Sequence, residues 1–281
     1  MSEAGAAHHH PEQSEGSGLA VQADTRYARK NRMEVRGRLR GGRNHERDMV
    51  VADNIAEVRR RIVEAARRAD RDPGEVSLMA VTKTQPPERI REAYQAGIRL
   101  LGENRVQAFA GKADALRDLK DAEWHMIGHL QTNKAAKAAE LFVAVDSVDS
   151  LRLGQKLNSA AQVLGKKLAV LIEINVGGEA AKSGVVPGSN ELEDILGAAA
   201  DLEYLEFHGL MTVPPFTEDP EQARPYFRKL RELRDQIAVR QWPGIGTNVL
   251  SMGMSHDFEV AIEEGSTCVR VGTAIFGERT T

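Results

Sequence analysis

The sequence has one cysteine, few aromatic residues and no long hydrophobic run, and each shortage excludes a class of protein. Because Cys268 is the only cysteine among 281 residues, an internal disulfide framework is excluded and a reducing compartment is expected. No apolar run reaches the roughly 18–20 residues that a membrane-spanning helix needs. The start lacks the charged and apolar segments of a signal peptide. We therefore expect a soluble, cytoplasmic protein.

An excess of charge of one sign is also lacking. The 38 basic and 41 acidic side chains give a formal net charge of −3, which argues against a basic surface that covers the whole protein. We expect neither a membrane nor a nucleic acid as a partner of the folded part. The spacing of histidine, cysteine and acidic residues suggests no metal site.

The first 48 residues differ from the rest in charge pattern and lack apolar periodicity. Residues 1–25 hold four acidic residues and no Lys or Arg, whereas residues 26–47 hold nine basic and two acidic residues. Such a segment can bury too little apolar surface to offset the entropy lost on ordering. We expect residues 1–48 to be a disordered, arginine-rich extension and residues 49–281 to be the folded domain.

The remainder alternates between apolar strands and helices. A helix is expected over 54–68, capped by Asp53 or Asn54, with Ile55, Val58 and Ile62 on one face. Strands are then expected at 76–82, 98–102, 123–130, 141–147, 167–176, 205–213, 248–252 and 268–276. Helices between them favour a parallel sheet, as a (β/α)8 barrel or a doubly wound sheet. We favour the barrel. Because the last strand lies almost at the C-terminus, we expect the helix at 54–68 to cover the place of an eighth helix.

The first strand ends in Lys83, at the place where a barrel carries its functional groups. One interpretation is a surface lysine whose stem packs on apolar neighbours while its head reaches water. The other is an amine that condenses with an aldehyde to form a Schiff base. The sequence pattern at this position alone leaves both open.

Strands seven and eight end in glycine-rich turns, within residues 250–257 and 271–277. Glycine lets backbone N–H groups approach an anion closely, and barrels often hold phosphate after these two strands. The same glycines could serve tight turns alone. Arg270, just before Gly272, could face a ligand ring or lie in a buried ion pair. Together with Lys83, these turns suggest a phosphate-bearing aldehyde anchored at both ends.

Seven segments carry a resemblance to one family. They read Ala80-Val-Thr-Lys-Thr84, Gly102-Glu-Asn-Arg-Val-Gln107, Trp124-His-Met-Ile-Gly-His-Leu-Gln-Thr-Asn-Lys134, Lys182-Ser-Gly184, Gly209-Leu-Met-Thr212, Leu250-Ser-Met-Gly-Met-Ser255 and Gly265-Ser-Thr-Cys-Val-Arg-Val-Gly-Thr-Ala-Ile-Phe-Gly277. In this order they resemble the pyridoxal-phosphate homeostasis proteins (YggS/PROSC family). The resemblance implies a (β/α)8 barrel similar to the N-terminal domain of alanine racemase, the fold-type III arrangement.

The resemblance also implies a cofactor, pyridoxal 5′-phosphate (PLP), and the residues that hold it. Lys83 would bind PLP as an internal aldimine, and Asn104 would lie close to the cofactor. Arg270 would face the pyridine nitrogen, and Lys182 matches a family lysine near the site, a candidate secondary acceptor. The phosphate would be held by Ser251, Gly253, Gly272 and Thr273.

The implied role is intracellular vitamin B6 homeostasis, in which PLP is held as a lysine aldimine and released to PLP-dependent apo-enzymes. We expect negligible turnover and assign no catalytic residue. An arginine at the ring nitrogen disfavours its protonation and weakens the electron sink, and a racemase needs a second base, a tyrosine in alanine racemase. The alternatives are a fold-type III racemase or decarboxylase and a cofactor-free Schiff-base aldolase.

Overall fold

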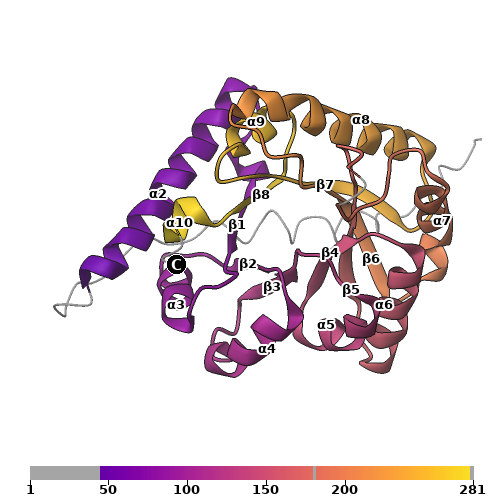
Figure 1. Cartoon of the computed structure of the whole chain (residues 1–281), viewed down its shortest axis with the longest axis horizontal. Coiled ribbons are helices and arrows are strands. Elements are labelled where there is room, and N and C mark those ends of the chain that lie inside the picture. The colour runs from indigo at the N-terminus through magenta and orange to yellow at the C-terminus, as the bar shows by residue number, and fades with distance from the viewer. Residues whose placement is uncertain (1–44, 180–181, 279–281) are drawn as a thin grey trace, which may run out of the picture. The chain divides into compact units, whose positions relative to one another are not determined.

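The strands close into a single parallel barrel in chain order, β1-β2-β3-β4-β5-β6-β7-β8 (Figure 1). The computed structural model describes residues 45–179 and 182–278. The (β/α)8 barrel expected from the sequence is thereby confirmed, and the doubly wound sheet is excluded. The strands are β1 Ser77–Val81, β2 Leu100–Glu103, β3 Glu123–Met126, β4 Ala144–Val148, β5 Leu168–Glu173, β6 Leu205–Met211, β7 Ile245–Met254 and β8 Cys268–Val271.

Helices lie outside the barrel and connect successive strands (Figure 1). Two of them begin at serine caps, because Ser150 Oγ accepts from the Leu153 amide and Ser189 Oγ from the Leu192 amide. The helices are α2 His45–Arg68, α3 Pro87–Gln95, α4 Val106–Ala113, α5 Ala135–Leu141, α6 Leu151–Val163, α7 Asn190–Ala198, α8 Arg224–Arg240, α9 Phe258–Glu263 and α10 Thr273–Phe276.

Helix α2 begins earlier than the sequence led us to expect. The expected start near Asn54 is wrong, since the helix begins at His45, and the expected boundary between residues 48 and 49 falls inside it. No glycine or proline interrupts residues 45–68, and among the side chains that are described Val51, Ile55 and Val58 form a buried stripe. Residues 1–44 of the expected extension lie outside the described residues.

Helix α2 covers the place where a helix after β8 would otherwise pack. It contacts α9, α10 and α3, and Asn54 Nδ2 donates to the Ile275 carbonyl at 2.9 Å. This position agrees with the expectation that the helix takes the place of an eighth outer helix.

The eighth strand is shorter than expected. We expected residues 268–276 to be extended, but β8 stops at Val271 and Thr273–Phe276 forms the short helix α10. At Gly272 the chain turns, and the amides of Ile275 and Phe276 donate to the Gly272 carbonyl, each at 2.9 Å. The apolar run that suggested a strand buries Ile275 and Phe276 from a helix instead.

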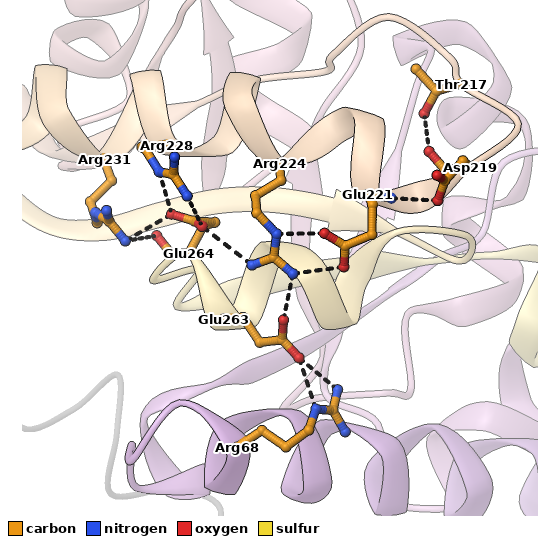
Figure 2. A network of polar contacts seen from close by, with 9 residues as sticks. All are labelled: Arg68, Thr217, Asp219, Glu221, Arg224, Arg228, Arg231, Glu263 and Glu264. Atoms are coloured by element: carbon orange, nitrogen blue, oxygen red, sulfur yellow. Dashed lines mark hydrogen bonds and ion pairs between the residues drawn. The ribbon is translucent and has the colours of Figure 1, made fainter.

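A network of arginine and glutamate side chains ties α2, α8 and α9 together (Figure 2). Glu264, directly after α9, is only 4% exposed. Its carboxylate lies 3.3 Å from Arg224, 3.0 Å from Arg228 and 2.9 Å from Arg231, which share one face of α8. Glu263 bridges Arg224 at 2.7 Å and Arg68 of α2 at 2.8 Å. The network thus joins helices that are distant in the sequence.

The barrel has two apolar cores because side chains alternate along each strand. One core lies between strands and helices. The other fills the barrel interior and consists of Met79, Val81, Ile127, Leu171, Met211, Val249 and Cys268, with Leu100 packed against it. Cys268 is a packed core thiol, and burial raises its pKa to about 12. The alternation shows which residues near the strand ends face the interior.

Candidate functional site

Most residues singled out from the sequence lie on four neighbouring strands or directly after them, at the carboxyl end of the barrel. β8 pairs with both β1 and β7, and β1 pairs with β2. Lys83 follows β1, Asn104 follows β2, Ser251 and Gly253 are on β7, and Arg270 is on β8 with Gly272 and Thr273 after it. Met79, Val81, Val249 and Cys268 face the interior on these strands, and Lys83, Ser251, Gly253, Arg270 and Gly272 continue the same alternation.

Lys83 is exposed at the mouth, on a short loop that is fixed from behind. The ammonium of Lys112 on α4 donates hydrogen bonds to the carbonyls of Thr82, at 2.9 Å, and Gln85, at 3.3 Å. The same ammonium lies 2.6 Å from Oε1 of the buried Glu103. Within the described part of the chain, no carboxylate pairs with Lys83 itself. Its amine therefore projects from a rigid support without a competing ion pair.

Arg270 is buried in the barrel interior, with its guanidinium held by two hydrogen bonds. Nη1 donates to Ser251 Oγ and Nη2 to the Thr212 carbonyl, each at 2.7 Å. Burial lowers the pKa of Arg270, and the charges of Asp146 and Glu173 oppose this shift, so the group remains a cation. Among the described residues no carboxylate forms an ion pair with Arg270, so hydrogen bonds take the place of the buried ion pair that the sequence left open.

The turns after β7 and β8 interlock through a serine that our list of binding residues left out. Ser255 Oγ accepts from the amides of Gly272 at 3.2 Å and Ala274 at 3.3 Å. Gly253 has φ +91°, and a Cβ there would lie 2.5 Å from that of Ala261, so only glycine fits. The hydroxyl of Ser251, in contrast, is occupied by Arg270. Ser255 belongs to the glycine-rich segment after β7, and its place shortly before helix α9 is the one feature of the sequence that points to an anion-binding role.

Lys182 lies in a different sector from Lys83. It follows β5, and its ammonium lies 2.9 Å from Glu179 and 3.3 Å from the Pro214 carbonyl. The strand order separates β5 from β1 by three strands on either side. The structure therefore does not bring the two lysines together on neighbouring strands.

Buried acidic groups, which no motif had indicated, also occupy the barrel interior. Asp146 on β4 pairs with His125 on β3 at 2.9 Å. Glu173, the last residue of β5, is 6% exposed. Burial raises the pKa of Glu173 to about 7 and the nearby charge of Asp149 adds to this, while Arg270 opposes it. A carboxyl that titrates near neutral pH is typical of functional sites.

A pocket of about 240 Å³ opens beside Asn104. It is lined in part by Arg105, His129, Gln131 and Lys134, so cationic and amide groups surround it. In the described ranges, no group of three or more histidine, cysteine or acidic side chains is placed to hold a metal ion. Nor does any helix of those ranges have the length and apolar character to cross a membrane.

The family model for the alanine racemase N-terminal domain matches residues 54–280. The chain is 47% identical over 231 residues to the pyridoxal phosphate homeostasis protein of Aquifex aeolicus, covering 82% of this chain and 99% of that protein. It is 44% identical to the protein of the same name from Pseudomonas aeruginosa, over 82% of this chain and 96% of that one.

A solved structure, PipY of Synechococcus elongatus with PLP bound, superimposes with a TM-score of 0.70 and 35% identity. The match covers 81% of this chain and 100% of PipY. Both the fold and the length of the matching region therefore agree with those of relatives whose names refer to PLP.

Proposed function

The chain belongs to the alanine racemase N-terminal domain family, and from that premise we propose that it binds PLP and serves PLP homeostasis. The observation that carries this proposal is the arrangement at the barrel mouth. Lys83, whose amine has no carboxylate partner among the described residues, follows β1 next to β8, and the turn after β8 carries two amides that donate to Ser255 Oγ. An aldehyde that carries a phosphate needs these two features together.

The residues present fit the cofactor. The turn after β8 offers the amides of Gly272 and Ala274, which converge on Ser255 Oγ, and Thr273 is exposed beside them. We propose that these four residues hold the phosphate, with Gly253 allowing the β7 turn to pack closely. In this assignment Ser251 acts on Arg270 rather than on the phosphate. Asn104 directly follows β2, which pairs with β1, and we propose that it lies close to the ring.

When bound, PLP supplies an aldehyde that condenses reversibly with a primary amine. Lys83 provides that amine, and Lys112 orients it by fixing the loop at Thr82 and Gln85. Arg270 presents a fixed positive charge from β8 to the ring and so disfavours a proton on the ring nitrogen. These residues bind and orient the cofactor, and a reversible bond lets a second amine take it away. We therefore propose delivery of PLP to apo-enzymes, with negligible turnover and a cytoplasmic location.

The racemase alternative needs a second base facing the cofactor, and the described tyrosines offer no support for it. Tyr94 on α3 donates its hydroxyl to Asp121 on the outside of the barrel. Tyr204 lies before β6 against Lys167, and Tyr226 on α8 lies against Lys229. We therefore keep the carrier as the favoured function.

The test is the visible absorption of the protein saturated with PLP, for the wild type, Lys83→Ala and the matched control Lys137→Ala. Lys137 is an exposed residue of α5 paired with Glu140. The proposal predicts that only Lys83→Ala loses the band of PLP bound to an amine. Retention of that band in Lys83→Ala would contradict the proposal, and so would racemisation of amino acids at rates on the order of 1–10³ per second.

A further inference from the structure

Glu173 is an acidic residue at the barrel mouth that the proposed function leaves unused. Its Oε2 is buried and has no hydrogen-bond partner among the described residues. Its Oε1 accepts a single long hydrogen bond from Ser183 Oγ, at 3.4 Å. Burying a carboxyl with so few partners costs free energy, so its position needs an explanation other than stability.

The position of Glu173 aims this carboxyl into the site. Leu171 belongs to the interior core, so Glu173, two residues later on β5, faces the interior as well. In the closed ring of eight strands β5 lies opposite β1, which leads into Lys83. A Cβ at Gly184 would lie 3.3 Å from Cγ of Glu173, so the loop after β5 packs against its stem. The carboxyl and the lysine amine thus face the same mouth from opposite sides.

The charged groups around Glu173 leave it able to exchange a proton at neutral pH. Burial raises the pKa of Glu173, and the negative charge of Asp149, after β4, raises it further. The charge of Arg270 on β8, the hydrogen bond from Ser183 and the charge of His129 after β3 each lower it. Asp146 on the neighbouring β4 is held by His125, and Lys182 in the adjoining loop is paired with Glu179. Together these groups hold the pKa of Glu173 at about 7, so both of its protonation states are populated at neutral pH.

We propose that Glu173 takes up and returns the proton that must move when one amine replaces another on the bound aldehyde. This inference rests on the proposed function. A primary amine in solution at neutral pH is an ammonium ion, and it must lose a proton before its nitrogen can attack. Glu173 Oε2 accepts that proton as a carboxylate, and the neutral carboxyl returns it as the Lys83 nitrogen departs. The proton count and the state of Glu173 are restored after each exchange.

The test compares two amines that reach the protein in different protonation states. The full-length protein loaded with PLP is mixed with excess ethylamine, which is protonated at neutral pH, or with methoxyamine, which is largely neutral. The loss of the bound cofactor band is followed over time. For Glu173→Gln we expect release to ethylamine to slow at least tenfold and release to methoxyamine to slow much less. The matched control is Glu140→Gln, an exposed residue paired with Lys137.

A second readout needs no cofactor. Infrared difference spectra of the cofactor-free wild type should show a buried carboxyl titrating near pH 7, and Glu173→Gln should lack it. Absence of this titration in the wild type overturns the proposal even if the variant fails to fold, and so does equal slowing with both amines. If Lys83→Ala still binds PLP covalently, the proposed function itself fails, which is a different outcome.

Discussion

At the scale of single residues, the proposed site depends on side chains that their neighbours hold in one position. In the proposed function Lys83 provides the reacting amine, and Lys112 and Glu103 hold the loop that carries it. Gly253 matters because it has no side chain, since one there would collide with α9, which follows β7. Two predictions follow from these residues.

Replacing Lys112 with Met removes three contacts of one ammonium and leaves the carboxylate of Glu103 buried without a cation. We expect the free energy of unfolding to fall by roughly 3 kcal/mol and PLP to bind more weakly, because the Lys83 loop loses its support. Urea denaturation and PLP titration measure the two effects. Lys112→Arg should restore part of the lost unfolding free energy and part of the lost PLP affinity. Unchanged PLP affinity in Lys112→Met would contradict the idea that Lys112 supports the Lys83 loop.

Replacing Gly253 with Ala should destabilise the protein by about 3 kcal/mol, since it combines a positive φ with a close contact to Ala261. Gly165→Ala is the matched control, because Gly165 has φ +60° but nothing within 4 Å of the added Cβ. That control should cost about 1 kcal/mol. If Gly253→Ala and Gly165→Ala lost the same free energy of unfolding in thermal or urea denaturation, the close contact with Ala261 would not explain the effect at Gly253.

The sequence predicted the position of the candidate binding residues better than the residues that surround them. Lys83, Asn104, Arg270 and Gly272 lie at or directly after strand ends, as expected, and their role in binding stays a prediction. Glu173 could not be found in this way, because an acid at the end of an apolar strand has no spacing pattern. Its significance depends on burial and on Asp149 and Arg270, which come from other strands.

At the scale of elements, the Glu263–Glu264 network holds α2 against α8 and α9 (Figure 2). Helix α2 contacts α9 and α10, which precede and follow β8 in the chain, so this network holds helices that flank the strand carrying Arg270. The sequence predicted the existence of these elements but misplaced several of their ends; β3, for example, stops at Met126 and not at residue 130. Apolar patterning did not reveal that α2 starts at His45, nor that β8 gives way to α10 at Gly272, because both depend on tertiary packing.

Glu264→Gln should destabilise the protein by about 2 kcal/mol, because three arginines share its nearly buried carboxylate. Glu221→Gln is the control, since Glu221 is exposed and pairs with Arg224 alone, and it should cost less than about 1 kcal/mol. Although burial acts to raise the pKa of Glu264, its arginine partners hold it below the ordinary 4.5. Its stabilising effect is therefore complete above pH 4.5 and is lost as the pH falls through the lowered pKa. Equal losses for the two variants in urea unfolding would contradict this reading.

At the scale of the whole molecule, Glu173 gives stability a second pH dependence, of opposite sign. Its pKa rises from 4.5 to about 7 on folding, so the folded state binds the proton more tightly. The associated stability is present below pH 4.5 and is lost as the pH rises through about 7. At about 1.4 kcal/mol for each pKa unit, the loss amounts to roughly 3 kcal/mol. Unfolding free energies of wild type and Glu173→Gln should converge at low pH, and parallel profiles would contradict this prediction.

We also propose that residues 49–281 contain everything needed to bind PLP, although the helix that begins this unit starts at His45. The matches with the two relatives include nearly the whole length of each relative but only 82% of this chain. A chain that begins at His45 should therefore bind PLP with the affinity of the full chain. A large loss of affinity, measured by titration of folded protein, would assign a binding role to residues 1–44.

The central claim is a covalent bond between the Lys83 amine and PLP, and the most direct measurement is to locate that bond. The PLP-saturated full-length protein is reduced with borohydride, digested and mapped by peptide mass. The account predicts the reduced adduct on the peptide that contains Lys83, at one per chain. An adduct chiefly on Lys182, on a lysine outside the barrel mouth, or on no peptide at all would contradict it.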